Sequence, residues 1–426
     1  MPSMPSMQLL DKAEPLDAWR SPIGGLSNQQ PDNYVLHKAP DARRLHLTRV
    51  ADLLRTHSNV LEADPLGQPI VRHEILAWAP SPAGLNAARA AGFAVLRSMD
   101  ALELRMVVLR APNHANTAAA LNALRARDPD GVYDFNHVYL GSTGKLADAV
   151  VKRGAALAGK DATTPADNTA TRIGLIDSGI ASDHIVFKDA NIVRWGCDNK
   201  PRPAQHGTAV AALMVGQSGL FYGVAPGAKL YAADVYCDSA SGGSADRIAR
   251  ALTWLADENV AVINLSLVGP PNLAIEQVVA AMVKRGHLLV AAVGNDGPAA
   301  APLFPASYPG VIGVSAVDLR GRPLPEAARG PQVLFAAPGS DMFSAAIGNP
   351  AFRQVRGTSF ASPIVAALLA VQLNRPEQAG AKQAVARLAR MAIGEPTRAT
   401  DNGRISNDTG YGIVGESFRT NSIRSQ

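Results

Sequence analysis

Three hydroxyl side chains lie close together in the stretch 354–371, which reads QVRGTSFASPIVAALLAV. Thr358, Ser359 and Ser362 directly precede Pro363 and a long apolar run. Pro363 fits the first turn of a helix, where its missing N–H would be unpaired anyway. A hydroxyl just before that helix would lie at the positive end of its dipole, among unpaired N–H groups. Such a position suits a nucleophile that generates an anion, and it equally suits an ordinary helix cap.

Two more polar residues stand where an α/β sheet would place a site. Asp177 follows the apolar run at 173–176, and His206 opens the helical segment HGTAVAALMVG. Sites in α/β sheets form at the carboxyl ends of the strands. Each residue alone is typical of a turn or a helix end. Together with Ser359 they supply a carboxylate, a base and a hydroxyl, and a serine hydroxyl attacks poorly unless a base takes its proton.

The N-terminal half predicts a small α+β unit. Leucines and a valine at helical spacing predict a helix over 41–56. From 72 to 139 the chain alternates strand, helix, strand, strand, helix and strand, with Ser81 as a helix cap and Gly92 as a helix stop. This βαββαβ order is that of a ferredoxin-like sandwich.

The C-terminal half predicts a different architecture. Short continuous apolar runs such as TRIGLI, VAVINLSL and HLLVAAVG alternate with helical segments such as ADRIARALTWLADE. Strands that are apolar on both faces indicate a mostly parallel sheet covered on both sides, hence an α/β three-layer sandwich. We therefore divide the chain into an N-terminal extension with one helix (1–71), the small unit (72–139), an exposed polar linker (140–170) and a large α/β domain (171–426).

Composition narrows the function classes. The chain has 426 residues, 47% hydrophobic and 18% charged, and its basic residues exceed its acidic ones by five. No basic stripe interleaved with aromatic residues suggests a nucleic-acid partner. No apolar stretch reaches the about 18 residues of a membrane helix. Asp11, Lys12 and Glu14 stand where a signal peptide needs apolar residues. These charges favour a cytoplasmic location. A secreted or periplasmic location stays open if an export signal is missing from this sequence.

Five segments together resemble the subtilisin-like serine peptidases (subtilases, peptidase family S8). They are IGLIDSGI, HGTAVAALMVG, VINLSL, VAAVGNDG and GTSFASP. The resemblance covers about 171–415, and the order Asp, His, Ser is that of subtilisin. The preceding βαββαβ unit resembles the inhibitory propeptide of the same family, which implies a subtilisin-like catalytic domain behind a propeptide-like domain.

The resemblance assigns four catalytic roles. Ser359 is the nucleophile, His206 is its general base, and Asp177 orients the imidazole and stabilises its charged form. Asn295 and the backbone N–H of Ser359 would donate hydrogen bonds to the oxyanion of the tetrahedral intermediate.

Substrate is expected to bind as an added strand, held mainly by main-chain bonds. The residues that the resemblance assigns to this cleft are Ser241, Gly242, Gly243, Ser266, Leu267, Gly269, Ala292, Gly294 and Leu303. Leu303, near the pocket floor, favours modest apolar side chains at the cleavage position.

The sequence differs from the family pattern at positions that bear on metal binding, and it contains two cysteines. Ala209 stands where many relatives carry a second, noncatalytic histidine. The loop VGQSGLFYG lacks the oxygen donors of the familiar high-affinity calcium site, so we expect no cofactor and no strongly bound calcium. The resemblance implies that Cys197 and Cys237 lie near the same rim of the catalytic domain, which favours a disulfide and thus an oxidising compartment. Two free thiols in a cytoplasmic enzyme are the alternative.

The resulting hypothesis is a serine endopeptidase made as a self-processing zymogen. Its partners would be a polypeptide substrate and its own N-terminal domain, an intramolecular inhibitor whose final strand lies in the cleft, with Tyr139 as the candidate self-cleavage position. The alternative is a binding or regulatory module on the same scaffold, with the cleft permanently occluded. Ester hydrolysis or acyl transfer by the same residues also stays open.

Overall fold

The computed structural model describes residues 42–102, 104–112, 115–141, 170–219, 221–393 and 405–419. The expected linker lies almost wholly outside these ranges, as do the first 41 residues. Among the described helices, none is long and apolar enough to cross a membrane.

A seven-stranded parallel sheet forms the centre of the molecule. Its order is β16-β15-β14-β12-β7-β11-β8, and every neighbouring pair is parallel. The strands are β7 (Arg172–Asp177), β8 (Ile192–Trp195), β11 (Lys229–Asp234), β12 (Val262–Leu265), β14 (Leu288–Ala292), β15 (Ile312–Val317) and β16 (Val333–Pro338). The predicted apolar runs form β7, β11, β12, β14 and β15. The sequence reading missed the edge strands β8, which is only half-buried, and β16, which ends in a proline.

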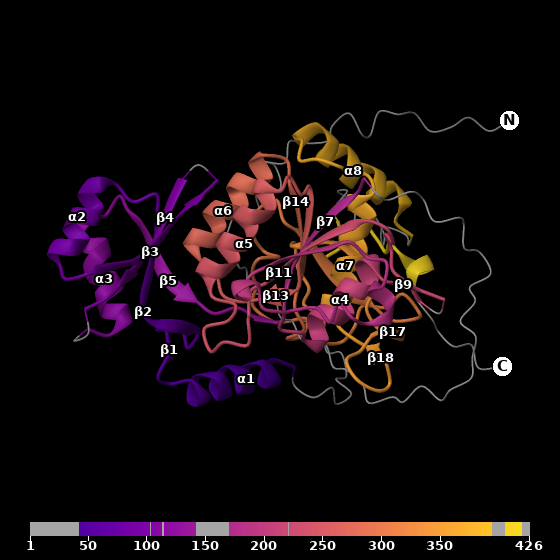
Figure 1. Ribbon diagram of the computed structural model, residues 1–426, viewed down its shortest axis with the longest axis horizontal. Helices are drawn as coiled ribbons and strands as arrows, with labels where there is room; N and C mark the ends of the chain where they lie inside the picture. The colour runs from indigo at the N-terminus through magenta and orange to yellow at the C-terminus, as the bar shows by residue number, and fades with distance from the viewer. Residues whose placement is uncertain are drawn as a thin grey trace.

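Helices cover both faces of this sheet, as Figure 1 shows. One layer consists of α4 (Gln205–Val215), α7 (Thr358–Ala370) and α8 (Gln378–Met391), and the other of α5 (Ala245–Asp257) and α6 (Leu273–Lys284). Two buried hydrophobic clusters correspond to these two layers. The α/β three-layer sandwich is therefore present, and the carboxyl ends of its parallel strands meet at one rim.

The N-terminal unit has its own antiparallel sheet in the order β5-β2-β4-β3, with β1 also paired to β2. Its elements are α1 (Ala42–Thr56), β1 (Leu61–Ala63), β2 (Pro69–Trp78), α2 (Pro82–Ala90), β3 (Ala94–Ala101), β4 (Leu104–Arg110), α3 (Thr117–Arg127) and β5 (Val132–His137). The first strand of the βαββαβ order thus begins three residues before the expected boundary. The Ser81 hydroxyl accepts from the N–H of Gly84 and caps α2, as predicted.

Short strands complete the described chain. They are β6 (Leu140–Gly141), β9 (Gln217–Ser218), β10 (Phe221–Tyr222), β13 (Leu267–Val268), β17 (Met342–Ala345) and β18 (Phe352–Val355), with single 3₁₀ turns η3 (Ile185–Phe187), η4 (Cys197–Asn199) and η5 (Glu416–Phe418). Of these, β6 pairs with β13 and so ties the end of the N-terminal unit to the large domain.

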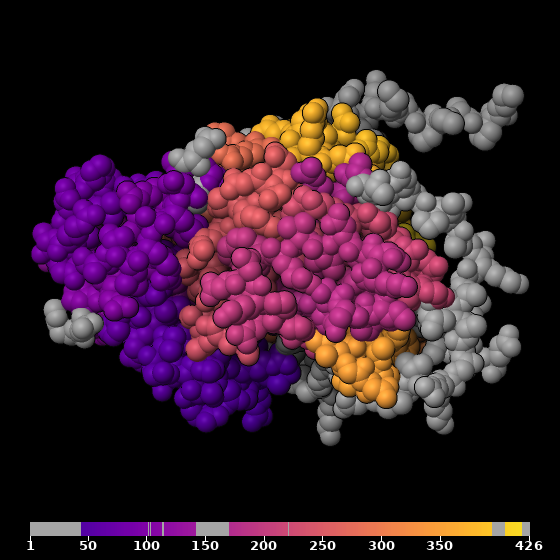
Figure 2. Space-filling model, viewed as in Figure 1, coloured from indigo at the N-terminus to yellow at the C-terminus, as the bar shows by residue number. Residues whose placement is uncertain are grey.

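The small sheet is covered on both faces, by different parts of the chain. Its own helices α2 and α3 cover one face. The other face packs on α5 and α6, where Leu76, Trp78 and Met106 share a buried cluster with Ile248 and Val278. Figure 2 shows the indigo and violet N-terminal unit pressed against the body of the molecule. The two parts therefore share a continuous apolar contact.

Candidate active site

Asp177 and His206 form a direct pair. Asp177 ends the central strand β7, and His206 lies in the first turn of α4. The two oxygens of the Asp177 carboxylate lie 2.9 and 3.0 Å from Nδ1 of the imidazole. The carboxylate also accepts from the backbone N–H of Ser178 at 2.6 Å and from its hydroxyl at 3.0 Å. These bonds hold the carboxylate so that its charge faces the imidazole.

Ser359 lies inside the first turn of α7, because this helix begins at Thr358. The expectation that Pro363 opens the helix is wrong: the proline lies within it. Because proline has no N–H, the carbonyl of Ser359 lacks its usual donor four residues on. The hydroxyl of Ser266 takes that place, donating to this carbonyl at 3.2 Å and lying 3.3 Å from the Ser362 hydroxyl. Ser266 thereby anchors the turn that carries Ser359.

His206 and Ser359 each have one side-chain atom with no hydrogen-bond partner among the described residues. The imidazole centroid lies 5.4 Å from the ring of Phe360, the residue next to Ser359. Both Nε2 of His206 and the hydroxyl of Ser359 are buried without a hydrogen-bond partner in the described part of the chain. Buried polar atoms are rarely left unpaired, and those that are call for an explanation.

Asn295 contacts the same helix start. It follows β14 and Gly294, whose φ of 101° suits glycine. The side-chain oxygen of Asn295 accepts from the N–H of Thr358 at 3.0 Å and from its hydroxyl at 3.2 Å. Beside it, Asp296 lies 3.4 Å from Nδ1 of His46 on α1.

The segment 138–141 forms a strand between the two predicted cleft edges. On one side Val138 bridges Ser244, and the N–H of Tyr139 donates to the carbonyl of Gly243 at 2.8 Å. On the other side Leu140 and Gly141, which form β6, pair antiparallel with Val268 and Leu267 respectively. The chain thus continues past Tyr139 along the edge that leads to Ser266.

The other predicted cleft residues lie near the end of β14 and in the loop that follows β11. Gly294 and Leu303 are neighbours, since a Cβ on Gly294 would come within 2.6 Å of the Leu303 side chain. Ala292 is buried at the end of β14. Gly242 donates its N–H to the carbonyl of Ser239, and the hydroxyl of Ser241 lies 3.4 Å from that of Ser239. These last two residues shape the edge loop that ends at Gly243.

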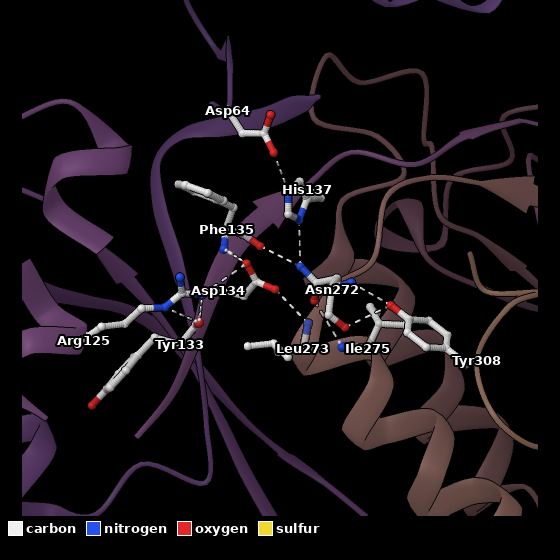
Figure 3. Close-up of polar contacts among 10 residues, drawn as sticks. All are labelled: Asp64, Arg125, Tyr133, Asp134, Phe135, His137, Asn272, Leu273, Ile275 and Tyr308. Atoms are coloured by element: carbon white, nitrogen blue, oxygen red, sulfur yellow. Dashed lines mark hydrogen bonds and ion pairs between the residues drawn. The ribbon is translucent and has the colours of Figure 1, made fainter. Parts of the chain in front are cut away.

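A buried polar network joins the N-terminal unit to the start of α6 (Figure 3). Asn272 caps α6 with its side-chain oxygen. Its amide group donates to the carbonyl of Phe135 at 2.8 Å and to Nδ1 of His137 at 3.0 Å, and Nε2 of that imidazole lies 3.2 Å from Asp64. Asp134 accepts the N–H of Leu273 at 2.7 Å. A carboxylate at the N-terminus of a helix is favoured by the helix dipole.

A second network joins the same unit to the start of α5. Asn136 accepts the N–H of Asp246 at 3.2 Å and donates to its carboxylate at 2.9 Å. Arg97 bridges Asp246 and Glu74, with distances of 2.8 and 2.7 Å. Burial alone would raise the pKa of the Asp246 carboxyl, but the Arg97 charge and the hydrogen bonds from Ser244 and Asn136 hold it below its ordinary value.

Two groups near Asp177 have shifted pKa values. Burial disfavours the charged imidazole of His206, but the charge and hydrogen bond of Asp177 outweigh it, so the pKa of His206 is raised. Burial, followed by the charges of Asp177 and Asp234, raises the pKa of Tyr236 well above its ordinary value. The imidazole can therefore carry a proton beside Asp177, as a base that receives one must.

Cys197 and Cys237 are joined by a disulfide, with Cα atoms 5.1 Å apart. It links the turn after β8 to the loop after β11, which leads into the cleft edge at Gly243. Among the described residues, Cys197, Cys237 and Asp234 are also the one group of potential metal ligands close enough to share an ion. The two sulfurs are bonded to each other, so they are not thiolate ligands in this state.

The sequence reading missed the residues around the Tyr139 side chain. The hydroxyl of Tyr139 donates to the carbonyl of Pro270 at 2.9 Å and lies 3.5 Å from that of Tyr308. Asn272 could have been found as a helix cap, because it precedes a helical segment. Tyr308 carries no such signal: its loop comes near Tyr139 only through the fold.

Comparisons with known proteins show the family of this chain. A family model described as the subtilase family matches residues 168–412. The chain is 34% identical over 231 residues to subtilisin DY of Bacillus licheniformis, covering 52% of this chain and 83% of that protein. It is 35% identical over 217 residues to subtilisin E of Bacillus subtilis strain 168, and this match covers 48% of this chain and 55% of that protein.

Solved structures share the fold. Fervidolysin from Fervidobacterium pennivorans, a keratinolytic enzyme related to subtilisin, has a TM-score of 0.66 at 19% identity, covering 84% of this chain and 62% of that one. The epidermin leader peptide processing serine protease of Staphylococcus aureus has a TM-score of 0.59 at 16% identity. The match covers 83% of this chain and 99% of that one. These shares of the chain exceed what residues 171–426 could supply, so the likeness includes part of the N-terminal unit. The chain belongs to the subtilase family and is a serine-type endopeptidase.

Proposed function

We propose that the protein hydrolyses peptide bonds through Ser359, His206 and Asp177, with Asn295 in the oxyanion hole, and that it is made as a self-processing zymogen. The Asp177 carboxylate orients the imidazole, whose Nε2 takes the proton of the Ser359 hydroxyl as that oxygen attacks the carbonyl carbon. The resulting oxyanion accepts from the Asn295 amide and the Ser359 N–H. His206 then returns the proton to the leaving amine, which leaves the acyl group as an ester on Ser359. A water molecule, deprotonated by the same imidazole, attacks that ester; the acid is released and the Ser359 hydroxyl takes back the proton.

The observation that carries the proposal is the strand 138–141, hydrogen-bonded to both edges of the cleft that leads to Ser359. A peptide held this way is bound like a substrate by β-addition. Because it belongs to the same chain, it excludes other polypeptides until it leaves. The N-terminal unit is thus an intramolecular inhibitor, positioned by its contacts with α5 and α6.

The pairing revises the expected processing point. Tyr139 pairs beside Gly243, and the chain runs on through Leu140 and Gly141 toward Ser266, the edge residue bonded to Ser359. We therefore propose that self-cleavage occurs beyond Gly141 rather than after Tyr139, between 141 and 170. The domain boundaries at 71, 139 and 170 remain part of this proposal.

The test is the intact mass of purified wild type and of Ser359→Ala after incubation, with casein hydrolysis measured in parallel. Ser362→Ala is the matched control, because it removes a hydroxyl from the next turn of the same helix. We expect the wild type and the control to lose a fragment ending between 141 and 170, and to digest casein. Ser359→Ala should remain at 44.5 kDa.

The alternative is a regulatory module whose cleft stays occluded, which the buried networks at α5 and α6 favour. In that case the wild type would also remain intact and casein would be untouched. Cleavage that persists in Ser359→Ala would contradict both functions.

A further inference from the structure

Helix α1 lies beside the strand 138–141. Its residues His46, Val50 and Leu53 recur at intervals of four and three, so they share one face of the helix. Val50 is buried and belongs to one apolar cluster with Val138, the first residue of the strand. Further along, α1 and β6 together line a pocket of about 380 Å³. The helix therefore accompanies the strand at both of its ends.

The start of α1 contacts the large domain next to the proposed oxyanion hole. Nδ1 of His46 lies 3.4 Å from the Asp296 carboxylate, and both side chains are mostly buried, with 16% and 14% of their surface exposed. Asp296 directly follows Asn295, the proposed oxyanion donor. Figure 1 shows α1 in indigo, extending from beside β1 along the large domain. A single helix thus contacts both the inhibitory strand and the loop that carries Asn295.

We propose that α1 is a second inhibitory element, which holds the strand 138–141 in the cleft through the contact between His46 and Asp296. The inference deepens the proposed function and rests on it. The strand pairs with the cleft edges over only four residues, and so short a strand is held weakly by main-chain bonds alone. Helix α1 adds a contact that does not use those edges, because it packs on Val138 at one point and reaches Asp296 at another.

The position of this contact in the chain gives it a role after self-cleavage. His46 precedes the proposed cut between 141 and 170, whereas Asp296 follows it. Their contact therefore joins the two fragments once the peptide bond between them is broken. The cleft stays occupied until the N-terminal fragment dissociates, so cleavage and activity become separate events. Because a single polar pair contributes modestly, its loss should speed dissociation by about 3- to 10-fold.

The experiment follows the full-length protein over time with two signals: intact mass reports self-cleavage, and a fluorogenic peptide reports activity. His46→Ala is compared with the wild type and with Arg55→Ala, which removes a largely exposed side chain from the same helix. Both substitutions precede the proposed cut, so the activated enzyme is the same molecule in all three cases. We expect equal rates of cleavage, but a delay between cleavage and activity that is about 3- to 10-fold shorter in His46→Ala alone.

Two results of this time course would overturn the inference. One is a delay that His46→Ala leaves unchanged, and the other is a wild type that becomes active as soon as it is cut. Val50→Ala is a second variant, because it weakens the packing of α1 on Val138 and leaves His46 in place. It should also shorten the delay. An equal effect of Arg55→Ala would overturn the inference too, because that residue contacts neither the strand nor Asp296.

Hydrogen exchange separates this inference from the proposed function. In full-length Ser359→Ala, the further change His46→Ala should speed exchange of the amides of residues 138–141 by about 3- to 10-fold. Exchange in β3, at the edge of the small sheet away from β5, should not change. An equal rise in β3, or no rise in 138–141, overturns the inference. If 138–141 alone responds but the wild type never cuts itself, the proposed function fails and the role of α1 stands.

Discussion

Two buried polar regions of the molecule differ in whether their polar side-chain atoms have hydrogen-bond partners. At the catalytic end, Nε2 of His206 and the hydroxyl of Ser359 have no partner among the described residues. At the interface between the N-terminal unit and α5 and α6, Asp134, Asn136 and Asn272 each hold partners across it. A site for chemistry must keep atoms available for the substrate, whereas a docking surface gains specificity by satisfying every group.

The largest expected effect is at the open catalytic end. His206→Ala removes the base that Ser359 requires, so kcat/KM on a peptide substrate should fall by about 10⁴-fold or more. Fluorogenic peptide assays and intact mass will measure this. The midpoint of thermal unfolding should fall as well, because the variant leaves the buried Asp177 carboxylate without the imidazole nitrogen 2.9 Å away. A fully active variant would contradict the assigned role.

Asn295→Ala should have the next largest effect. Loss of one oxyanion donor lowers kcat by about 10²- to 10³-fold, with KM nearly unchanged, because the oxyanion exists only after attack. Thr358→Val is the control: it removes the hydroxyl that donates to Asn295 but leaves the amide in place. Equal losses in the two variants would show that Asn295 only anchors the helix start.

Substitutions at the interface between the N-terminal unit and α5 and α6 should lower the stability of the protein rather than its catalytic rate. Arg97→Ala leaves the buried Asp246 carboxylate without its cation, and we expect the full-length Ser359→Ala protein to lose about 1–3 kcal/mol of stability. Denaturant unfolding will measure it. Arg105→Ala, which removes an exposed side chain that hydrogen-bonds to the Ser98 hydroxyl, should change stability much less. A similar loss would argue against the interface network.

The smallest expected effect is a shift in the pH at which kcat/KM reaches half of its maximum. Because the pKa of His206 is raised, kcat/KM should rise with pH through a midpoint above the ordinary value of about 6.5. The raised pKa of His206 also contributes to the stability of the folded protein, with the opposite pH dependence. This contribution is fully present below the pKa of the histidine in the unfolded chain and is lost as the pH rises through its pKa in the folded protein. Rate profiles between pH 5 and 10 will test this, and a midpoint at or below 6.5 would contradict the coupling to Asp177.

Much of the fold followed from local pattern. The runs that form β7, β12 and β14 are apolar on both faces, which only a doubly covered sheet accommodates. Ser81 and Gly92 bounded α2 because capping is a matter of neighbouring backbone groups. The start of α7 was missed because Pro363 favours a first turn locally, whereas a hydroxyl 97 positions earlier, on Ser266, satisfies the carbonyl that the proline leaves open.

The sequence by itself determined the chemistry available: which side chains can attack, take a proton or hold a charge, and in which order they occur. Only the tertiary structure decided which residue of the 138–141 strand meets which edge, and that Pro270 and Tyr308 surround Tyr139. The physical reason is that residue type and local hydrogen bonding are properties of short stretches. Strand register and pocket walls depend instead on contacts between segments more than a hundred residues apart, which no short stretch encodes.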